Sequence, residues 1–246
     1  MFQRFFGKSV LDDQCSVDDV GLKMDSLQRF NHLLSVVYSG NYAPSIYCGE
    51  GALHLDEKDE NGEAVFINTE DEEQREFSMM LGDYDTLCAD PTVLAALQTP
   101  DDDNNSNEDW IFFCRRAFES WGTDRLVNFH GAPASHLEGQ SLDGILSSSP
   151  EADLLHELTH SVDIFSVRAN GRDMQSDDQD LRSGAKAYKF HGVTTLAEEN
   201  ADDPVVMLRN AETSMYHAAV SLLKQCWWYS GTCEALTQVN IDQCDL

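Results

Sequence analysis

The chain has 246 residues, of which 41% are hydrophobic and four are tryptophan, so it can bury a core and does not have the composition of a disordered protein. Forty-four acidic residues against sixteen basic ones give a formal net charge of −28, which repels nucleic acids and anionic membranes. No apolar run approaches the roughly 20 residues that span a bilayer. We therefore expect no nucleic-acid partner and no membrane partner.

The N-terminal third predicts one helix and one hairpin. Apolar residues recur at mostly helical spacing over residues 18–38, which favours a helix there. Two short β-like runs, 45–48 and 64–67, flank the acidic turn at 57–62, and this arrangement suggests a β-hairpin.

The middle of the chain predicts a short helix and a buried strand. Residues 91–98 favour a helix with Pro91 in its first turn. The acidic stretch 101–109 offers nothing to bury and indicates a solvated loop. Residues 110–114, Trp-Ile-Phe-Phe-Cys, are typical of a buried strand.

The second half predicts mainly helices, at about 150–168, 190–200 and 208–226, with a long polar loop at 169–183. The sequence shows no internal repeat and no long linker. We therefore expect one α+β domain over residues 1–246, with a small β-sheet and a mainly helical C-terminal half.

Seven cysteines are many for a cytosolic enzyme of this size, and none of them forms a CxxC pair. Their wide scatter favours disulfides in an oxidising compartment, with one thiol left over. We expect an extracellular protein whose leader is absent from this sequence, because the first residues lack the apolar core of a signal peptide. The cysteines are residues 15, 48, 88, 114, 226, 233 and 244.

Residues 156–160 read His-Glu-Leu-Thr-His, the motif on which the functional prediction depends. On a helix, His156 and His160 lie on one face and can bind one metal ion, while Glu157 can activate a metal-bound water. Ser149 as N-cap and Pro150 in the first turn specify the start of this helix. The Asn-Gly pair at 170–171 predicts its end.

Two histidines leave a catalytic zinc site one protein ligand short. The remaining ligand must come from downstream, and spacing leaves the choice between the acidic loop and Glu212. Asp163 continues the same helix, and a lone His191 is more typical of a structural role. The candidates are Asp163, Asp173, Asp177, Asp178, Asp180, His191 and Glu212.

Over residues 110–220 the chain resembles the deuterolysin-type aspzincins, a family of zinc metalloendopeptidases. The resemblance lies in the strand and cysteine of residues 111–114, in the Leu-Leu-His-Glu-Leu-Thr-His segment at 154–160, in Tyr188 with the helix that follows it, and in residues 209–216. It implies a zincin-like fold, a Zn²⁺ cofactor and a peptide or protein substrate.

The resemblance also implies site residues, with two departures. The family places its third ligand, an aspartate, three residues ahead of the tyrosine, but that position is Ala185 here, and Lys189 stands where the family has glycine. Some divergent members carry the aspartate further ahead, which implies Asp180 as the ligand. Tyr188 is implied as a hydrogen-bond donor to the oxyanion.

The sequence therefore predicts a secreted zinc metalloendopeptidase in which His156, His160 and Asp180 bind the metal and Glu157 and Tyr188 act in catalysis. One alternative is a catalytically impaired relative that binds protein partners, of which the missing aspartate at 185 would be the symptom. Another is a structural zinc domain, which a fourth protein ligand would favour.

Overall fold

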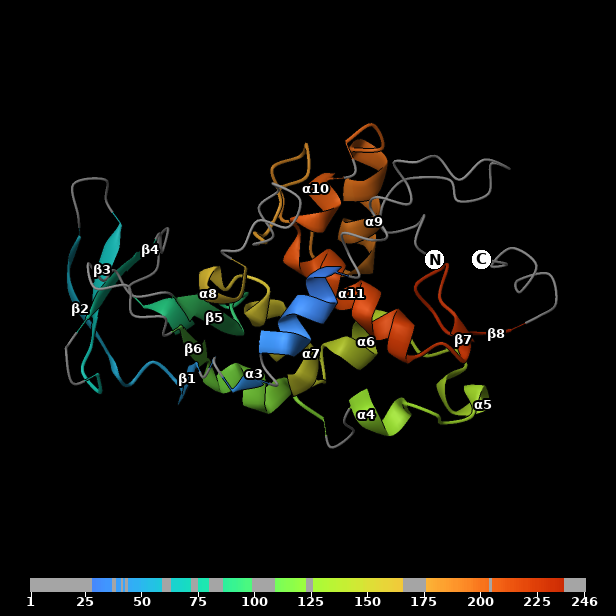
Figure 1. Ribbon diagram of the computed structural model, residues 1–246, viewed down its shortest axis with the longest axis horizontal. Coiled ribbons are helices and arrows are strands. Elements are labelled where there is room, and N and C mark those ends of the chain that lie inside the picture. Colours follow the sequence, from blue (N-terminus) through green and yellow to red (C-terminus); the bar gives the residue numbers. More distant parts are fainter. Residues whose placement is uncertain are drawn as a thin grey trace.

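The structure is a computed structural model that describes residues 28–36, 39–40, 42, 44–58, 63–71, 75–79, 86–98, 109–122, 126–165, 176–203 and 205–236. Most of its strands come from the first half of the chain and most of its helices from the second half (Figure 1). The class is therefore α+β, as predicted. None of the helices in the described ranges combines the length and the hydropathy of a membrane span.

The sheet nearest the candidate site has three strands in the order β1-β6-β5. β6 runs parallel to β1 and antiparallel to β5, so β1 and β5 are its outer strands. The three strands are β1 (Ser45–Cys48), β5 (Ala95–Gln98) and β6 (Trp110–Phe113).

The predicted buried strand is confirmed in β6, and both of its faces are covered. Trp110 and Phe112 pack into an aromatic cluster with Phe66 and Phe77 from the second sheet. The alternate residues, Ile111 and Phe113, belong to a cluster on the other face, which also contacts Leu154 and Leu158 of the helix that carries the histidines. Because both faces are apolar, β6 lies between the second sheet and this helix.

The second sheet corrects the predicted hairpin. Residues 64–67 do form a strand, but its antiparallel partner is the strand at 53–58, while residues 45–48 pair with β6. The acidic turn therefore connects the strand at 53–58, and not the run at 45–48, to the strand at 64–67. The strand at 53–58 contains the alternating Leu53 and Leu55 and was not predicted. The strands, in the order β2-β3-β4, are β2 (Leu53–Lys58), β3 (Ala64–Asn68) and β4 (Glu76–Met79).

The predicted helix at 91–98 is wrong, since residues 95–98 form strand β5. A helix of eight residues is marginal by itself because its nucleation is unfavourable. Pairing with the buried β6 supplies backbone hydrogen bonds, and the Cys114 N–H extends them by donating to the Leu94 carbonyl at 2.8 Å. A disulfide between Cys88 and Cys114 ties the two segments together.

The second half of the chain is mainly helical, as predicted, and its largest apolar core lies among α6, α9 and α11. The remaining elements are η1 (Leu87–Ala89), α3 (Arg115–Ser120), α4 (Leu126–Phe129), α5 (Ala134–Leu137), α6 (Leu142–Leu146), α7 (Pro150–Leu158), α8 (Val162–Phe165), α9 (Lys189–Glu199), α10 (Val205–Leu208), α11 (Ala211–Leu222), β7 (Cys226–Trp227) and β8 (Glu234–Ala235). Of the predicted N-terminal helix, residues 28–36 are described and are helical.

The helix predicted at 150–168 is divided in two. Ser149 is the N-cap of α7 and Pro150 its first residue, as predicted, but α7 ends at Leu158. The Thr159 hydroxyl donates to the His156 carbonyl at 2.8 Å, and the Ser161 hydroxyl accepts from Ile164 N–H at 3.0 Å as the cap of α8. These side-chain bonds replace helix bonds and break the helix well before the predicted stop at 170–171, which lies outside the described residues.

The predicted disulfides are present in part. Cys88 pairs with Cys114 and Cys226 with Cys233, while Cys48 is an exposed free thiol. Cys15 and Cys244 lie outside the described residues. Two disulfides are typical of an oxidising, extracellular environment.

Candidate metal centre

Helix α7 brings the two histidines together at the centre of the molecule, where it contacts β5 and α11 (Figure 1). His156 lies in its last turn, and His160 lies two residues beyond its end. The His160 N–H donates to the Glu157 carbonyl at 2.9 Å, so the chain keeps coiling past the formal end of the helix. The two imidazole centroids are 5.0 Å apart.

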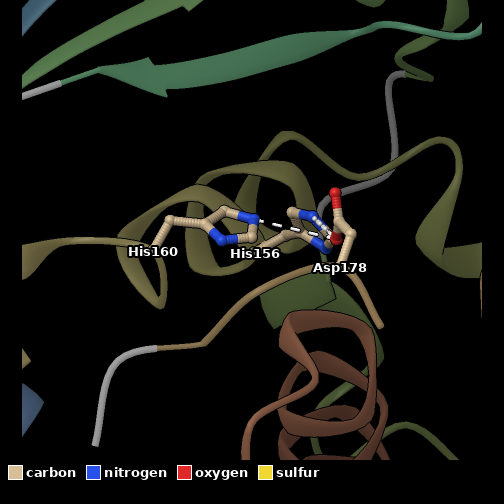
Figure 2. A group of neighbouring side chains, drawn as sticks. All are labelled: His156, His160 and Asp178. Atoms are coloured by element: carbon tan, nitrogen blue, oxygen red, sulfur yellow. Dashed lines mark ion pairs between the residues drawn. The ribbon is translucent and has the colours of Figure 1, made fainter. Parts of the chain in front are cut away.

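Asp178 reaches the histidines from the loop that precedes α9. Its neighbour Asp177 pins that loop to the start of α11, because the Asp177 N–H donates to the Arg209 carbonyl at 2.7 Å and the Asp177 carbonyl accepts from Ala211 N–H at 3.1 Å. Figure 2 shows the two rings and the Asp178 carboxylate side by side, with a dashed line from each ring to the carboxylate.

The distances within this group suit a metal ion. Asp178 Oδ1 lies 3.2 Å from His156 Nε2 and 3.8 Å from His160 Nε2. One ligand atom from each residue lies within 4.8 Å of the other two. We call His156, His160 and Asp178 the metal-ligand cluster.

Asp180, the expected third ligand, is not part of this cluster, and Asp178 takes its place. The Asp180 carboxylate points to Lys186, with 3.1 Å between Oδ1 and Nζ, and more than half of its side chain is exposed. The separation of Asp180 from the histidines has a physical cause, because a bridge between Asp180 and Lys186 turns the loop back on itself. Asp173 and the side chain of Asp163 lie outside the described residues, and His191 is exposed on α9.

Hydrogen bonds on the far sides of the rings indicate which nitrogens could bind a cation. His160 Nδ1 lies 2.9 Å from the Ser176 carbonyl, and His156 Nδ1 lies 3.0 Å from Glu212 Oε2. Both partners are acceptors, so each neutral ring carries its proton on Nδ1 and its lone pair on Nε2. In this neutral form the two Nε2 lone pairs face Asp178 Oδ1, a buried oxygen to which only a protonated His156 could donate among the described residues. Three acceptors around one point fit a cation.

The titration of the cluster agrees with this arrangement. Burial by itself would lower the pKa of His156, but the carboxylates of Asp178, Glu212 and Glu157 outweigh it and raise that pKa well above its usual value. Burial would raise the pKa of Asp178, but His156 and His160 hold it well below its usual range. The pocket therefore favours positive charge at the His156 imidazole, supplied by a proton or by a metal ion.

Glu212, the runner-up candidate ligand, supports the cluster from outside. It lies in the first turn of α11 and is 8% exposed. One oxygen faces His156 Nδ1, and the other accepts from Lys189 N–H at 2.9 Å. A carboxylate on the far nitrogen of a ligating histidine fixes the ring and increases its basicity. The sequence offered Glu212 as a ligand, and the family resemblance aligned it with a structural aspartate that ties this helix to the loop, but neither indicated a bond to His156.

Glu157 is buried next to the metal-ligand cluster but is not one of its members. Its side chain is 7% exposed and lines the same cleft as both histidines. Burial raises the pKa of Glu157, although the two histidines and the backbone of Leu97 in β5 oppose this shift. A carboxylate with a raised pKa beside a metal site can accept and return a proton.

Tyr188 contacts the cluster through Asp178. The Tyr188 hydroxyl donates to Asp178 Oδ2 at 2.7 Å. Tyr188 is 42% exposed and lines the cleft. The next residue, Lys189, has φ of 62°, a backbone conformation that glycine adopts freely and other residues rarely do. This is the position at which the family resemblance expects glycine, and the bond from Lys189 N–H to Glu212 holds it.

The cleft in front of the cluster has a volume of about 870 Å³. Its lining includes the segment from Thr92 to Gln98, which contains β5, and also Asp143 and Tyr216. Asp153 also lines it, and its carboxylate accepts from Trp121 Nε1 at 2.7 Å. Burial raises the pKa of Asp153 to about 6, although the bond from Trp121 opposes the shift.

No protein-family model matches the chain, and no curated protein or solved structure matches it either.

Proposed function

We propose that the chain is a secreted, zinc-dependent metalloendopeptidase, a divergent relative of the deuterolysin-type aspzincins with a zincin-like fold. The observation that carries the proposal is the buried Glu157 beside two Nε2 lone pairs and one carboxylate oxygen at the floor of a cleft. Two imidazoles with one carboxylate are a common ligand set of catalytic zinc. Within the described residues the cluster has three members, which leaves a coordination position for the reaction and argues against a structural zinc site.

Zinc bound there would act as a Lewis acid on the scissile carbonyl and would acidify a water molecule. The Glu157 carboxylate would take the proton from that water and pass it to the leaving amine nitrogen, and its raised pKa suits this transfer. Glu212 would hold the His156 ring through Nδ1. Tyr188, released from Asp178, would donate a hydrogen bond from its hydroxyl to the oxyanion of the substrate.

The wall of the cleft supports a peptide as substrate. Among the described strands β5 is an outer strand of its sheet, so one of its edges carries backbone groups that none of these strands uses, although the Leu97 backbone bonds to the Glu157 carboxylate. β5 also contacts α7, which carries Glu157. An extended peptide can add to such an edge by main-chain hydrogen bonds, which brings its peptide bonds close to the catalytic carboxylate.

The alternative of an impaired binding protein rested on Ala185 in place of the family aspartate. Asp178 could supply the carboxylate that is missing at position 185, so Ala185 by itself does not favour the alternative. Residues 156–160 and the support from Glu212 favour catalysis instead.

Glu157→Gln tests the proposal. The zinc-loaded variant should bind zinc as the wild type does but cleave casein at least about 100-fold more slowly, because an amide cannot accept the proton of the water. Glu151→Gln is the matched control, since Glu151 lies on the same helix, bonds to Ser149 and is not part of the cleft lining. Wild-type turnover in Glu157→Gln would refute the mechanism, and a wild-type protein without zinc after reconstitution would refute the metal centre.

A further inference from the structure

We propose that Arg29 is a positioning residue of the metal centre and that it sets the separation between His160 and Asp178. The inference rests on the metal centre of the proposed function and not on its substrate. Arg29 lies in the helical segment 28–36, outside the region of family resemblance, and is 4% exposed. A buried guanidinium in a chain of net charge −28 is costly unless its donors are used.

The guanidinium contacts three segments that border the cluster. Its Nη2 donates to the Thr159 carbonyl at 3.3 Å and to the Ser176 hydroxyl, and its Nη1 donates to the Leu208 carbonyl. The face of the guanidinium lies 4.8 Å from the centroid of the Phe165 ring. Arg29 therefore joins the N-terminal helix to the end of α7, to the loop that carries Asp178 and to α10.

Ser176 is the link between this guanidinium and both ligands. It is fully buried, and each of its polar groups has a partner. Its N–H donates to the Thr159 carbonyl at 2.9 Å, its hydroxyl contacts Arg29, and its carbonyl lies 2.9 Å from His160 Nδ1. Asp178 follows two residues later, so the position of Ser176 determines both the ring orientation of His160 and the start of the ligand loop.

The contacts of Arg29 with Thr159 and Leu208 hold the two segments to which this loop is bonded. Thr159 is the C-cap of α7 and Leu208 is the last residue of α10, and carbonyls at helix C-termini attract a cation. The residue after Leu208 is Arg209, whose carbonyl accepts from Asp177 N–H at 2.7 Å. One planar cation thus anchors the segments on either side of the loop, a task that suits the fixed fork of arginine.

The test is the zinc affinity of Arg29→Met, measured by competition with a chelating dye, together with the thermal unfolding of the zinc-free protein. Loss of a residue that supports a ligand weakens metal binding by about 10–100-fold, and we expect a loss in this range. The absorption spectrum of the cobalt-loaded protein should also change, because the ligands shift. Arg29→Lys should recover only part of the affinity, since one ammonium cannot reach all three acceptors.

Arg116→Met is the matched control. Arg116 is also partly buried and also donates to two backbone carbonyls, those of Cys88 and Asp90, but away from the cluster. Its loss should lower the unfolding temperature and leave the zinc affinity and the cobalt spectrum at wild-type values. A purely structural role for Arg29 would give the same result as this control.

Ser176→Ala tests the same link with a smaller change. We expect Ser176→Ala to weaken zinc binding. In the double variant with Arg29→Met, the fold-loss of zinc affinity should be smaller than the product of the two single losses, because both substitutions remove the same contact. Wild-type affinity in Arg29→Met would overturn the inference, and if that protein does not fold, wild-type affinity in Ser176→Ala would do so. A wild-type protein that binds no zinc would overturn the proposed function as well.

Discussion

The sharpest test of the metal centre compares two isosteric changes only two residues apart, Asp178→Asn and Asp180→Asn. Asp178 Oδ1 lies 3.2 Å and 3.8 Å from the two histidine Nε2 atoms, whereas Asp180 lies 3.1 Å from Lys186 Nζ on the surface. Asp178→Asn removes an anionic ligand. Asp180→Asn removes an exposed ion pair, which contributes about 0–1 kcal/mol to stability.

The expected difference follows from ligand-linked stability. Zinc at 100 times its dissociation constant stabilises the folded protein by about 2.7 kcal/mol. Loss of a ligand should weaken binding by at least about 100-fold, since loss of a supporting residue already costs about 10–100-fold. At the same zinc concentration the stabilisation then falls to about 0.4 kcal/mol. A loss of about 2.3 kcal/mol corresponds to about 5–9 °C in unfolding temperature for a chain of this size.

The assay is thermal unfolding of both variants and of the wild type, with and without zinc. The zinc-dependent shift should nearly vanish in Asp178→Asn and remain at its wild-type value in Asp180→Asn. If Asp180→Asn loses the shift and Asp178→Asn keeps it, the assignment of the third ligand is refuted.

Three further outcomes are expected. Glu212→Gln should weaken zinc binding by about 10–100-fold at unchanged ligand number, measured by dye competition, and unchanged affinity would mean that Glu212 does not orient His156. Zinc affinity should rise with pH from acid through neutrality, because zinc binds only the neutral imidazole. The carboxylates around His156 raise the pKa of His156, so protons still compete with zinc above the usual histidine range. A flat pH profile of zinc binding in equilibrium dialysis would contradict this. Thiol titration under denaturing, non-reducing conditions should find at most three reactive cysteines of the seven, because two disulfides occupy four; five or more would contradict an oxidising compartment.

Local patterns determined several parts of this protein. The continuous apolar run at 110–113 favoured a buried strand, because nothing in it suits solvent, and the spacing of His156 and His160 could place both rings on one face of a helix. Ser149 and Pro150 fixed the start of α7 in the same way, since capping depends on a few neighbouring residues. The motif at 156–160 also identified Glu157 as the residue that can activate a metal-bound water.

Tertiary contacts decided the rest. The segment at 95–98 became a strand because β6 offered it a partner, and the break between α7 and α8 is held by the distant Asp109, whose Oδ2 accepts from the Ser161 hydroxyl. The placement of Asp178, rather than Asp180, beside the histidines depended on backbone contacts between residues 176–177 and two distant segments, near Thr159 and Arg209. Spacing along the chain carries no information about such contacts, since a loop can present any of its acids to a metal. The fold selects the acid by fixing the loop between two helix ends.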